Sequence, residues 1–483
     1  MKVDGAGRES EARFAAFVDG LAGVLGHADR AGPLMDYCTG LLLPGERKSV
    51  EPIASMVSPA RAAAAHQSLL HFVGQSAWSD KAMLAKVRGL AAPAFEAQGG
   101  VEAWIVDDTG FHKKGSHSVG VARQYCGRLG KTDNCQIAVT LSIANHHVSL
   151  PIAYRLYLPE DWAKDARRRK KAHIPEDVEF RTKPQIALAQ IEAAVKDGVE
   201  RGVVLTDAGY GCDGVFRAGV TTLGLTYAVG VQSTLSVWPP GEEPLAPKPW
   251  SGRGRKPSRL RHDAEHRPVS AKDLAIRLPA EAWNGVEWRE GSNQTLSSRF
   301  AAVRVRPASR DHKLVAPHPV EWLVVEWPEG DAEPTKYWLS TLPEDTPLAV
   351  LVDVIKLRWR IERDYEELKS ELGLAHFEGR GWRGFHHHAS LCIAAYGFLI
   401  LERSAFPPSA RWRREKPAFS GRSRSPRAPD PSRTPRGQLD RDDAQATDDR
   451  PGKIPLSMPM LPNRLDAIGS TLLRSQGISK PVQ

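Results

Sequence analysis

The spacing of apolar residues predicts a helical amino-terminal region. Between residues 9 and 95, Ala and Leu are frequent and apolar side chains recur every three or four positions, for example in ESEARFAAFVDGLAGVLGH. This period is typical of amphipathic helices. A helical region at the front of the chain is consistent with DNA binding and equally with a packing or dimerisation unit.

From about residue 101 the period changes to that of short strands. The expected strands are VEAWIVDD (101–108), CQIAVTLSIAN (135–145), VSLPIAYRLYL (148–158), RGVVLTDAGYG (201–211) and LGLTYAVGVQ (223–232). Between the third and fourth strands, residues 182–198 form an amphipathic pattern closed by Gly198, which predicts a helix. Three antiparallel strands, a helix and then a parallel strand is the order of a ribonuclease-H-like α/β fold.

The remaining sequence falls into three parts. Residues 233–345 carry Trp, Pro and short alternating runs, which predicts a β-rich insertion with a basic Gly/Pro loop at 251–262. Residues 345–374 predict one strong helix, and beyond about residue 403 the Pro-, Arg- and Ser-rich composition predicts a disordered or loosely packed basic tail. The expected domains are 1–98 (helical), 99–232 (first part of the core), 233–345 (insertion), 346–403 (second part of the core) and 404–483 (tail).

The composition gives only a weak indication of the class of binding partner. The net charge is +9 and the pI is about 9.3, which favours polyanions such as nucleic acid, although many basic proteins bind none. The five cysteines include no CxxC pair, which argues against a zinc ribbon or redox motif. With no apolar signal core and no membrane-length apolar stretch, we expect a soluble, cytoplasmic protein.

Two acidic positions follow apolar strand patterns. Asp107 or Asp108 closes one predicted strand, and Asp207 closes another. If these strands are neighbours, their acids project at the same edge of the sheet. Carboxylates gathered in this way can hold Mg²⁺, and two such ions catalyse in-line displacement at phosphorus.

A third acid lies on the long predicted helix. Spacings of four and seven residues place Arg358, Glu362 and Lys369 on one helix face. Beside them runs an apolar stripe, formed by Leu357, Ile361, Leu368 and Leu372. The helix is thus expected to bury one side and present Glu362 between two cations, although a solvated face with salt bridges gives the same pattern.

The segment RWRIERDYEELK resembles the signature of DDE transposases from bacterial insertion sequences, in the IS-four-like group. Arg358, Glu362 and Lys369 match that signature in identity and spacing, whereas Ile355 stands where the signature has Tyr. IVDDTGFHKKG is similar to the group's first motif and VVLTDAGYG to its second. Further similarity extends the resemblance over roughly residues 10–403.

The resemblance implies a metal-dependent enzyme that cuts insertion-sequence ends and joins them to target DNA. It implies that Asp108, Asp207 and Glu362 are catalytic and hold two ions of Mg²⁺ or Mn²⁺, with Asp107 as the near alternative to Asp108. It also implies double-stranded DNA as partner, namely terminal inverted repeats and target, bound by a homodimer in the nucleoid. The residues expected to contact DNA are Arg358, Lys369, Trp338, Tyr337, Lys113 and Lys114.

Weaker features have structural explanations as well. An aromatic of the insertion, with Tyr337 and Trp338 nearest the matching place, could stack on a flipped base or simply pack in a core. Basic runs at 164–171 and 253–261 suit phosphates but also occur on solvated faces. The consecutive residues His386, His387 and His388 lack ligand spacing and are expected to pack rather than bind metal.

Two other functions remain open. A decayed or repurposed transposase would bind DNA without cutting it. A ribonuclease-H-like resolvase is a further alternative, although such enzymes are usually short and lack a large β insertion.

Overall fold

The computed structural model describes residues 3–289 and 295–406. From residue 407 onward, the predicted tail (404–483) therefore lies outside the described residues. Within the described ranges, no helix combines the length and apolar character needed to cross a membrane.

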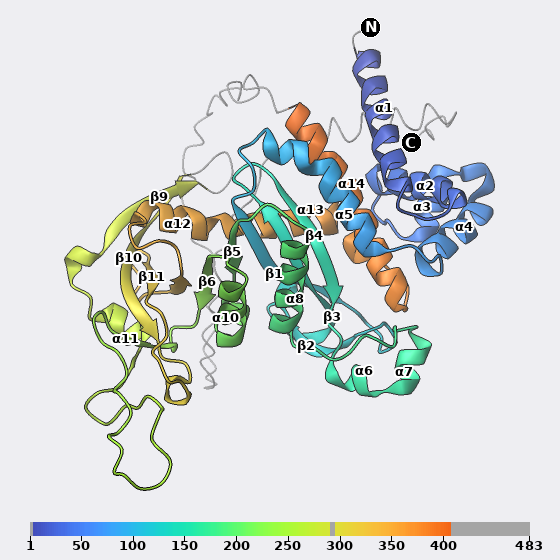
Figure 1. The fold of residues 1–483 in the computed structure, drawn as a ribbon. Helices are drawn as coiled ribbons and strands as arrows, with labels where there is room; N and C mark the ends of the chain where they lie inside the picture. The colour runs from blue at the N-terminus through green and yellow to red at the C-terminus, as the bar shows by residue number, and fades with distance from the viewer. Residues whose placement is uncertain (1–2, 290–294, 407–483) are drawn as a thin grey trace, which may run out of the picture.

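The amino-terminal region is helical, as its apolar spacing predicts. Its helices are α1 (Val3–Ala22), α2 (Ala31–Leu42), α3 (Val50–Val57), α4 (Ala62–Gly74) and α5 (Asp80–Glu96). They pack around the last described helix, α14 (Trp382–Ala405), beside which α5 runs in Figure 1. Phe14 of α1, for example, meets Phe398 of α14 edge-on with ring centroids 5.0 Å apart. These helices share one hydrophobic core with the sheet, so the domain boundary at residue 98 stays a prediction.

The centre of the molecule is a mixed sheet whose strand order agrees with the predicted ribonuclease-H-like core. The core strands are β1 (Ala103–His112), β3 (Lys131–Ala144), β4 (Ser149–Leu156), β5 (Val203–Thr206) and β6 (Tyr227–Val231). β3 pairs antiparallel with both β1 and β4, whereas β1 pairs parallel with β5 and β5 parallel with β6. A short strand, β2 (Ala122–Cys126), extends the edge beside β3.

Helices cover both faces of this core. α8 (Lys183–Lys196) and α10 (Gly214–Thr222) lie on one face, in front of the sheet in Figure 1. The predicted helix at 182–198 is confirmed: Thr182 and Gln185 form a capping box at its start, and Gly198, with φ +68°, follows its end. On the other face, Ser149 of β4 donates a hydrogen bond to Asp364 of α13 (Arg360–Ser370).

The insertion is β-rich, as predicted, and it continues the core sheet. Its strands are β7 (Ser236–Trp238), β8 (Val269–Ser270), β9 (Asn284–Arg289), β10 (Thr295–Pro307), β11 (Glu321–Trp327) and β12 (Lys336–Ser340), with one helix, α11 (Ala271–Ile276). β12 pairs antiparallel with β6, so the sheet runs from the core into the insertion without a break.

The single helix predicted over 345–374 is wrong in detail. The structure has α12 (Leu348–Lys356), a 3₁₀ turn (Leu357–Trp359) and then α13. α12 begins after Pro347, which lacks a backbone donor and fits a helix start. The predicted apolar stripe is buried from the turn through α13 and just beyond it, so the turn changes the helical path without exposing the core side.

Candidate active site

Asp107 and Asp108 lie in the middle of β1, which continues to His112. The prediction that this strand ends at the acids is therefore wrong: Thr109, Gly110 and Phe111 keep the ladder with β3. Because successive strand residues point to opposite faces of a sheet, the two neighbouring aspartates have different surroundings.

Asp107 faces the helix that carries the transposase-like signature. The Arg358 guanidinium lies 3.4 Å from Asp107 Oδ2 and 3.7 Å from Glu362 Oε1, so one cation connects the strand acid to the helix acid. Thr140, opposite Asp107 on β3, also interacts with Tyr365 of α13, which places this face of the sheet against α13.

Asp207 lies on the same face as Asp107. It directly follows β5, as predicted, and the β1–β5 register pairs Ile105 with Leu205, so the two aspartates stand at matching positions two residues further along. Burial raises the pKa of Asp107 to about 6; Arg358 opposes this effect, and the negative charge of Asp207 adds to it. The two carboxylates therefore interact electrostatically across neighbouring strands.

Asp207 is held at the start of a short helix, α9 (Ala208–Gly211), where its side chain accepts a hydrogen bond from the Gly209 backbone N–H at 2.9 Å. Close backbone packing fixes this turn. A Cβ at Gly211 would collide with the carbonyl oxygen of Gly230 on β6, so only glycine fits there.

Asp108 belongs to the opposite face. Its Oδ2 pairs with the ammonium group of Lys183, the first residue of α8, and its Oδ1 accepts a hydrogen bond from the Tyr210 hydroxyl. Both carboxylate oxygens thus have donors that tie β1 to α8 and α9. Lys183 was not among the residues predicted from the sequence. A sequence signal for it is the position of a lysine in the first turn of a predicted helix, where the helix dipole disfavours a cation.

Glu362 is the most exposed of the predicted catalytic acids, with 72% of its side chain accessible. It lies in the first turn of α13, one turn beyond Arg358.

Within the described residues, no three Asp, Glu, His or Cys side chains gather closely enough to form a metal-ligand group. Asp107, Asp207 and Glu362 nevertheless supply the hard oxygen donors that Mg²⁺ or Mn²⁺ prefers, and the mutual repulsion at Asp107 and Asp207 is what a bound cation would relieve.

The lysines predicted to contact DNA differ in whether their ammonium groups already bind the protein. Lys369 donates to the Gly110 carbonyl at 3.2 Å, and Lys113 donates to the Phe377 carbonyl at 2.8 Å, so both hold protein backbone in this conformation. Lys114 is exposed.

The two predicted stacking aromatics also differ. Tyr337 is buried at 3% exposure, and its hydroxyl donates to the Pro334 carbonyl, so it presents no face to a base in this conformation. Trp338, its neighbour on β12, is half-buried beside the Lys356 ammonium, which lies 5.7 Å from its ring. Lys356 also pairs with the buried Glu326 at 2.9 Å, which anchors α12 to the insertion just before Arg358.

The three consecutive histidines pack, as expected. All are buried on α14, where His387 lies between the carbonyls of Val73 and Trp78, and His388 meets the Tyr37 hydroxyl. Burial lowers the pKa of His387 to about 4.

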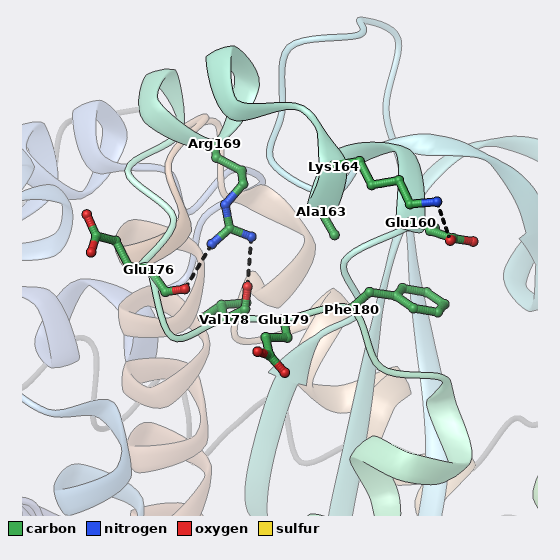
Figure 2. Close-up of a pocket in the computed structure, with 8 residues that line it drawn as sticks. All are labelled: Glu160, Ala163, Lys164, Arg169, Glu176, Val178, Glu179 and Phe180. Carbon is green, nitrogen blue, oxygen red and sulfur yellow. Dashed lines mark hydrogen bonds and ion pairs between the residues drawn. The ribbon is translucent and has the colours of Figure 1, made fainter.

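The basic run at 164–171 forms part of an open hollow of about 440 Å³ beside α6 (Glu160–Lys164) and α7 (Ala166–Lys171). Figure 2 shows Lys164 turned to Glu160, and Arg169 turned to the carbonyls of Glu176 and Val178. Lys164 and Arg169 are therefore engaged locally, and none of the predicted catalytic or DNA-contacting residues lines this hollow.

Comparisons with known proteins identify the family of the chain. The family model described as DDE superfamily endonuclease matches residues 20–295, more than half of the chain, a range that contains Asp107 and Asp207 and ends before Glu362. The chain is also 33% identical over 191 residues to a protein of Microchaete diplosiphon named "Probable transposase for insertion sequence element IS701". That match spans 39% of this chain and 45% of the relative, hence under half of the relative's length. On the family match, which covers more than half of its residues, the chain belongs to the DDE superfamily of endonucleases.

Proposed function

We propose that this chain is a transposase that cuts the ends of an insertion sequence and joins them to target DNA. The observation that carries the proposal is the placement of Asp107 and Asp207 on one face of the sheet, opposite Arg358 and Glu362. The relative's name points to the same reaction class.

The contacts favour Asp107 over Asp108 as the strand acid of the triad. Asp107, Asp207 and Glu362 would hold two divalent metal ions, Mg²⁺ or Mn²⁺, which would activate the attacking oxygen and stabilise the leaving oxygen of the phosphodiester. Arg358 neutralises the carboxylates beside it and offers guanidinium donors to a DNA phosphate. Asp108 acts as a positioning residue, because Lys183 and Tyr210 occupy both of its oxygens.

The proposed partners are the element's terminal inverted repeats and target DNA, bound by a homodimer. Lys114 is the most accessible of the predicted DNA contacts, and Trp338 is half-buried. The alternative function is a repurposed transposase that binds the same DNA without cutting it.

The test is metal-dependent cleavage of DNA carrying the inverted repeats that flank the gene. Asp107→Asn, Asp207→Asn and Glu362→Gln should each slow cleavage by roughly a hundredfold or more, because each removes charge that stabilises the transition state. All three should still bind the DNA ends. Asp108→Asn, the matched neighbour, should keep more activity than any of them.

Normal cleavage by Asp207→Asn or Glu362→Gln would reject the proposed site. Loss of cleavage in Asp108→Asn but not in Asp107→Asn would identify Asp108, and not Asp107, as the strand acid of the triad. Binding by the wild type without cleavage or joining in Mg²⁺ or Mn²⁺ would support the binding-only alternative.

A further inference from the structure

Residues 246–260 of the insertion, here called the basic arm, extend away from the body of the molecule at the lower left of Figure 1. The arm is closed at its base, where Leu245 and Arg261 exchange two backbone hydrogen bonds of 2.8 and 3.0 Å. Leu260 is buried and its N–H donates to the Leu314 carbonyl. Every residue from 248 to 259 is exposed, so the arm is anchored at its ends and projects between them.

The arm carries only positive charge. It contains no acidic residue, and its five cations are Lys248, Arg253, Arg255, Lys256 and Arg259. None of the five forms an ion pair with an acid in the part of the chain that the structure describes. The basic residues of α6 and α7 differ, since Lys164 pairs with Glu160 and Arg168 stacks over Trp162. Concentrated charge without acidic partners fits a polyanion.

A large aromatic accompanies these cations. Trp250 is 52% exposed, and its indole N–H donates to the Gly254 carbonyl at 3.2 Å. This bond, between residues four apart, holds the ring edge against the arm itself and away from the core. Gly252 and Gly254 have φ of +82° and +73°, a conformation that glycine adopts without strain and that allows the tight path around the indole.

We propose that the basic arm is a DNA-contacting element, in which its cations hold backbone phosphates and Trp250 stacks on a base. Phosphate contacts from Lys and Arg supply affinity, and an aromatic ring adds stacking that does not depend on sequence. This inference rests on the proposed function, because the partner of the arm is the DNA that the enzyme cuts. To the carboxylate site it adds a second surface that holds the same DNA. An exposed Trp among cations also suits an anionic lipid surface, which the experiment separates from DNA.

The charge contribution is tested with the full-length double variant Arg255→Gln/Lys256→Gln. The probes are a duplex carrying the terminal repeats and a random-sequence duplex of equal length, titrated at several salt concentrations. Loss of two phosphate contacts should weaken binding to both duplexes and make the slope of log K against log salt shallower by about 2. The control is Lys196→Gln/Arg277→Gln, which removes the same charge from exposed positions on α8 and after α11 and should leave the slope unchanged. An unchanged slope in the arm variant would overturn the proposal.

The stacking contribution is tested with Trp250→Ala and the conservative Trp250→Phe. Trp250→Ala should weaken binding roughly tenfold, in line with the loss of one stacked base, while the salt slope stays as in the wild type. Trp250→Phe should recover most of the affinity. Wild-type affinity in Trp250→Ala would remove Trp250 from the interface. Because the side chain is exposed, unfolding is not the expected outcome, and circular dichroism of each variant checks this.

The outcomes separate this inference from the proposed function. A wild-type protein that neither binds nor cuts end DNA would reject the proposed function. A wild-type protein that cuts DNA, together with arm variants that bind as tightly as it does, would reject the arm alone. Binding to phosphatidylserine vesicles that the arm substitutions abolish, with DNA binding unchanged, would assign the arm to membranes and also overturn the proposal.

Discussion

At the scale of single residues, the proposed site contains two adjacent aspartates with different partners. Asp107 faces Arg358 and the neighbouring Asp207, whereas Asp108 is held by Lys183 and Tyr210. The resemblance to the family motif, a strand followed by Asp-Thr, indicates Asp108 as the strand acid. Strand alternation, the register with β5 and the Arg358 contact instead favour Asp107, which is why the proposed site contains Asp107.

A buried acid behind the site gives a prediction on pH. Asp364 of α13 accepts hydrogen bonds from the hydroxyls of Ser149 (2.6 Å) and Tyr396 (2.8 Å). Burial nevertheless raises its pKa to about 6, and these two hydrogen bonds oppose that shift. Because the folded pKa lies above the unfolded one, the folded state binds more protons between about pH 4 and 6 and loses stability as pH rises through that window.

The variant Asp364→Asn should remove this loss. As pH rises from 4 to 8, the variant should gain about 2 kcal/mol of stability relative to the wild type, because only the wild type must release the proton of a buried carboxyl group. Urea unfolding at both pH values measures the difference. Glu366→Gln, at an exposed acid of the same helix, is the control and should show no such change. Parallel pH profiles for Asp364→Asn and the wild type would show that Asp364 is not the group responsible.

At the scale of elements, the turn that holds Asp207 depends on how closely α9 approaches β6. Gly211→Ala should destabilise the protein by about 1–3 kcal/mol, because the added methyl collides with the Gly230 carbonyl. Chemical denaturation measures the loss. Gly214→Ala is the matched control, since its nearest neighbour would be the Arg217 side chain at 3.8 Å, and it should be neutral or slightly stabilising. Equal stability of the two variants would contradict the close packing.

A second element-level prediction concerns the junction of α12 with the insertion. The Lys356 ammonium lies 4.0 Å from the centre of the Trp288 ring and pairs with the buried Glu326. Lys356→Met should cost about 3 kcal/mol, because it leaves a buried carboxylate without its main partner. Lys336→Met, which removes the exposed cation 3.9 Å from the same Glu326, should cost far less. If both substitutions cost the same, the buried pair is not the anchor.

The sequence predicted the elements better than it predicted their ends. Apolar spacing located the amino-terminal helices, α8 with its closing Gly198, and the strand before Asp207. It did not predict that β1 runs past the acids, because Thr109 and Gly110 interrupt the apolar pattern while their backbone still pairs with β3. It also missed the 3₁₀ turn at Leu357–Trp359, since apolar periodicity continues through it.

At the scale of the whole molecule, one sheet joins the acidic site to the insertion. β5, which precedes Asp207, pairs with β6, and β6 pairs with β12 of the insertion. This continuity was not predictable from sequence, because pairing between distant strands leaves no local pattern. The same sheet carries Trp338 on β12 and leads to the strands from which the basic arm projects.

The most direct test of the central claim is the position of Mn²⁺ in crystals of the protein with its end DNA, located by anomalous scattering. The account predicts Mn²⁺ ligated by Asp107 and Asp207, with Glu362 completing the protein ligands once DNA is bound. Mn²⁺ bound elsewhere, or Asp207 and Glu362 that do not share a metal centre in that complex, would contradict it.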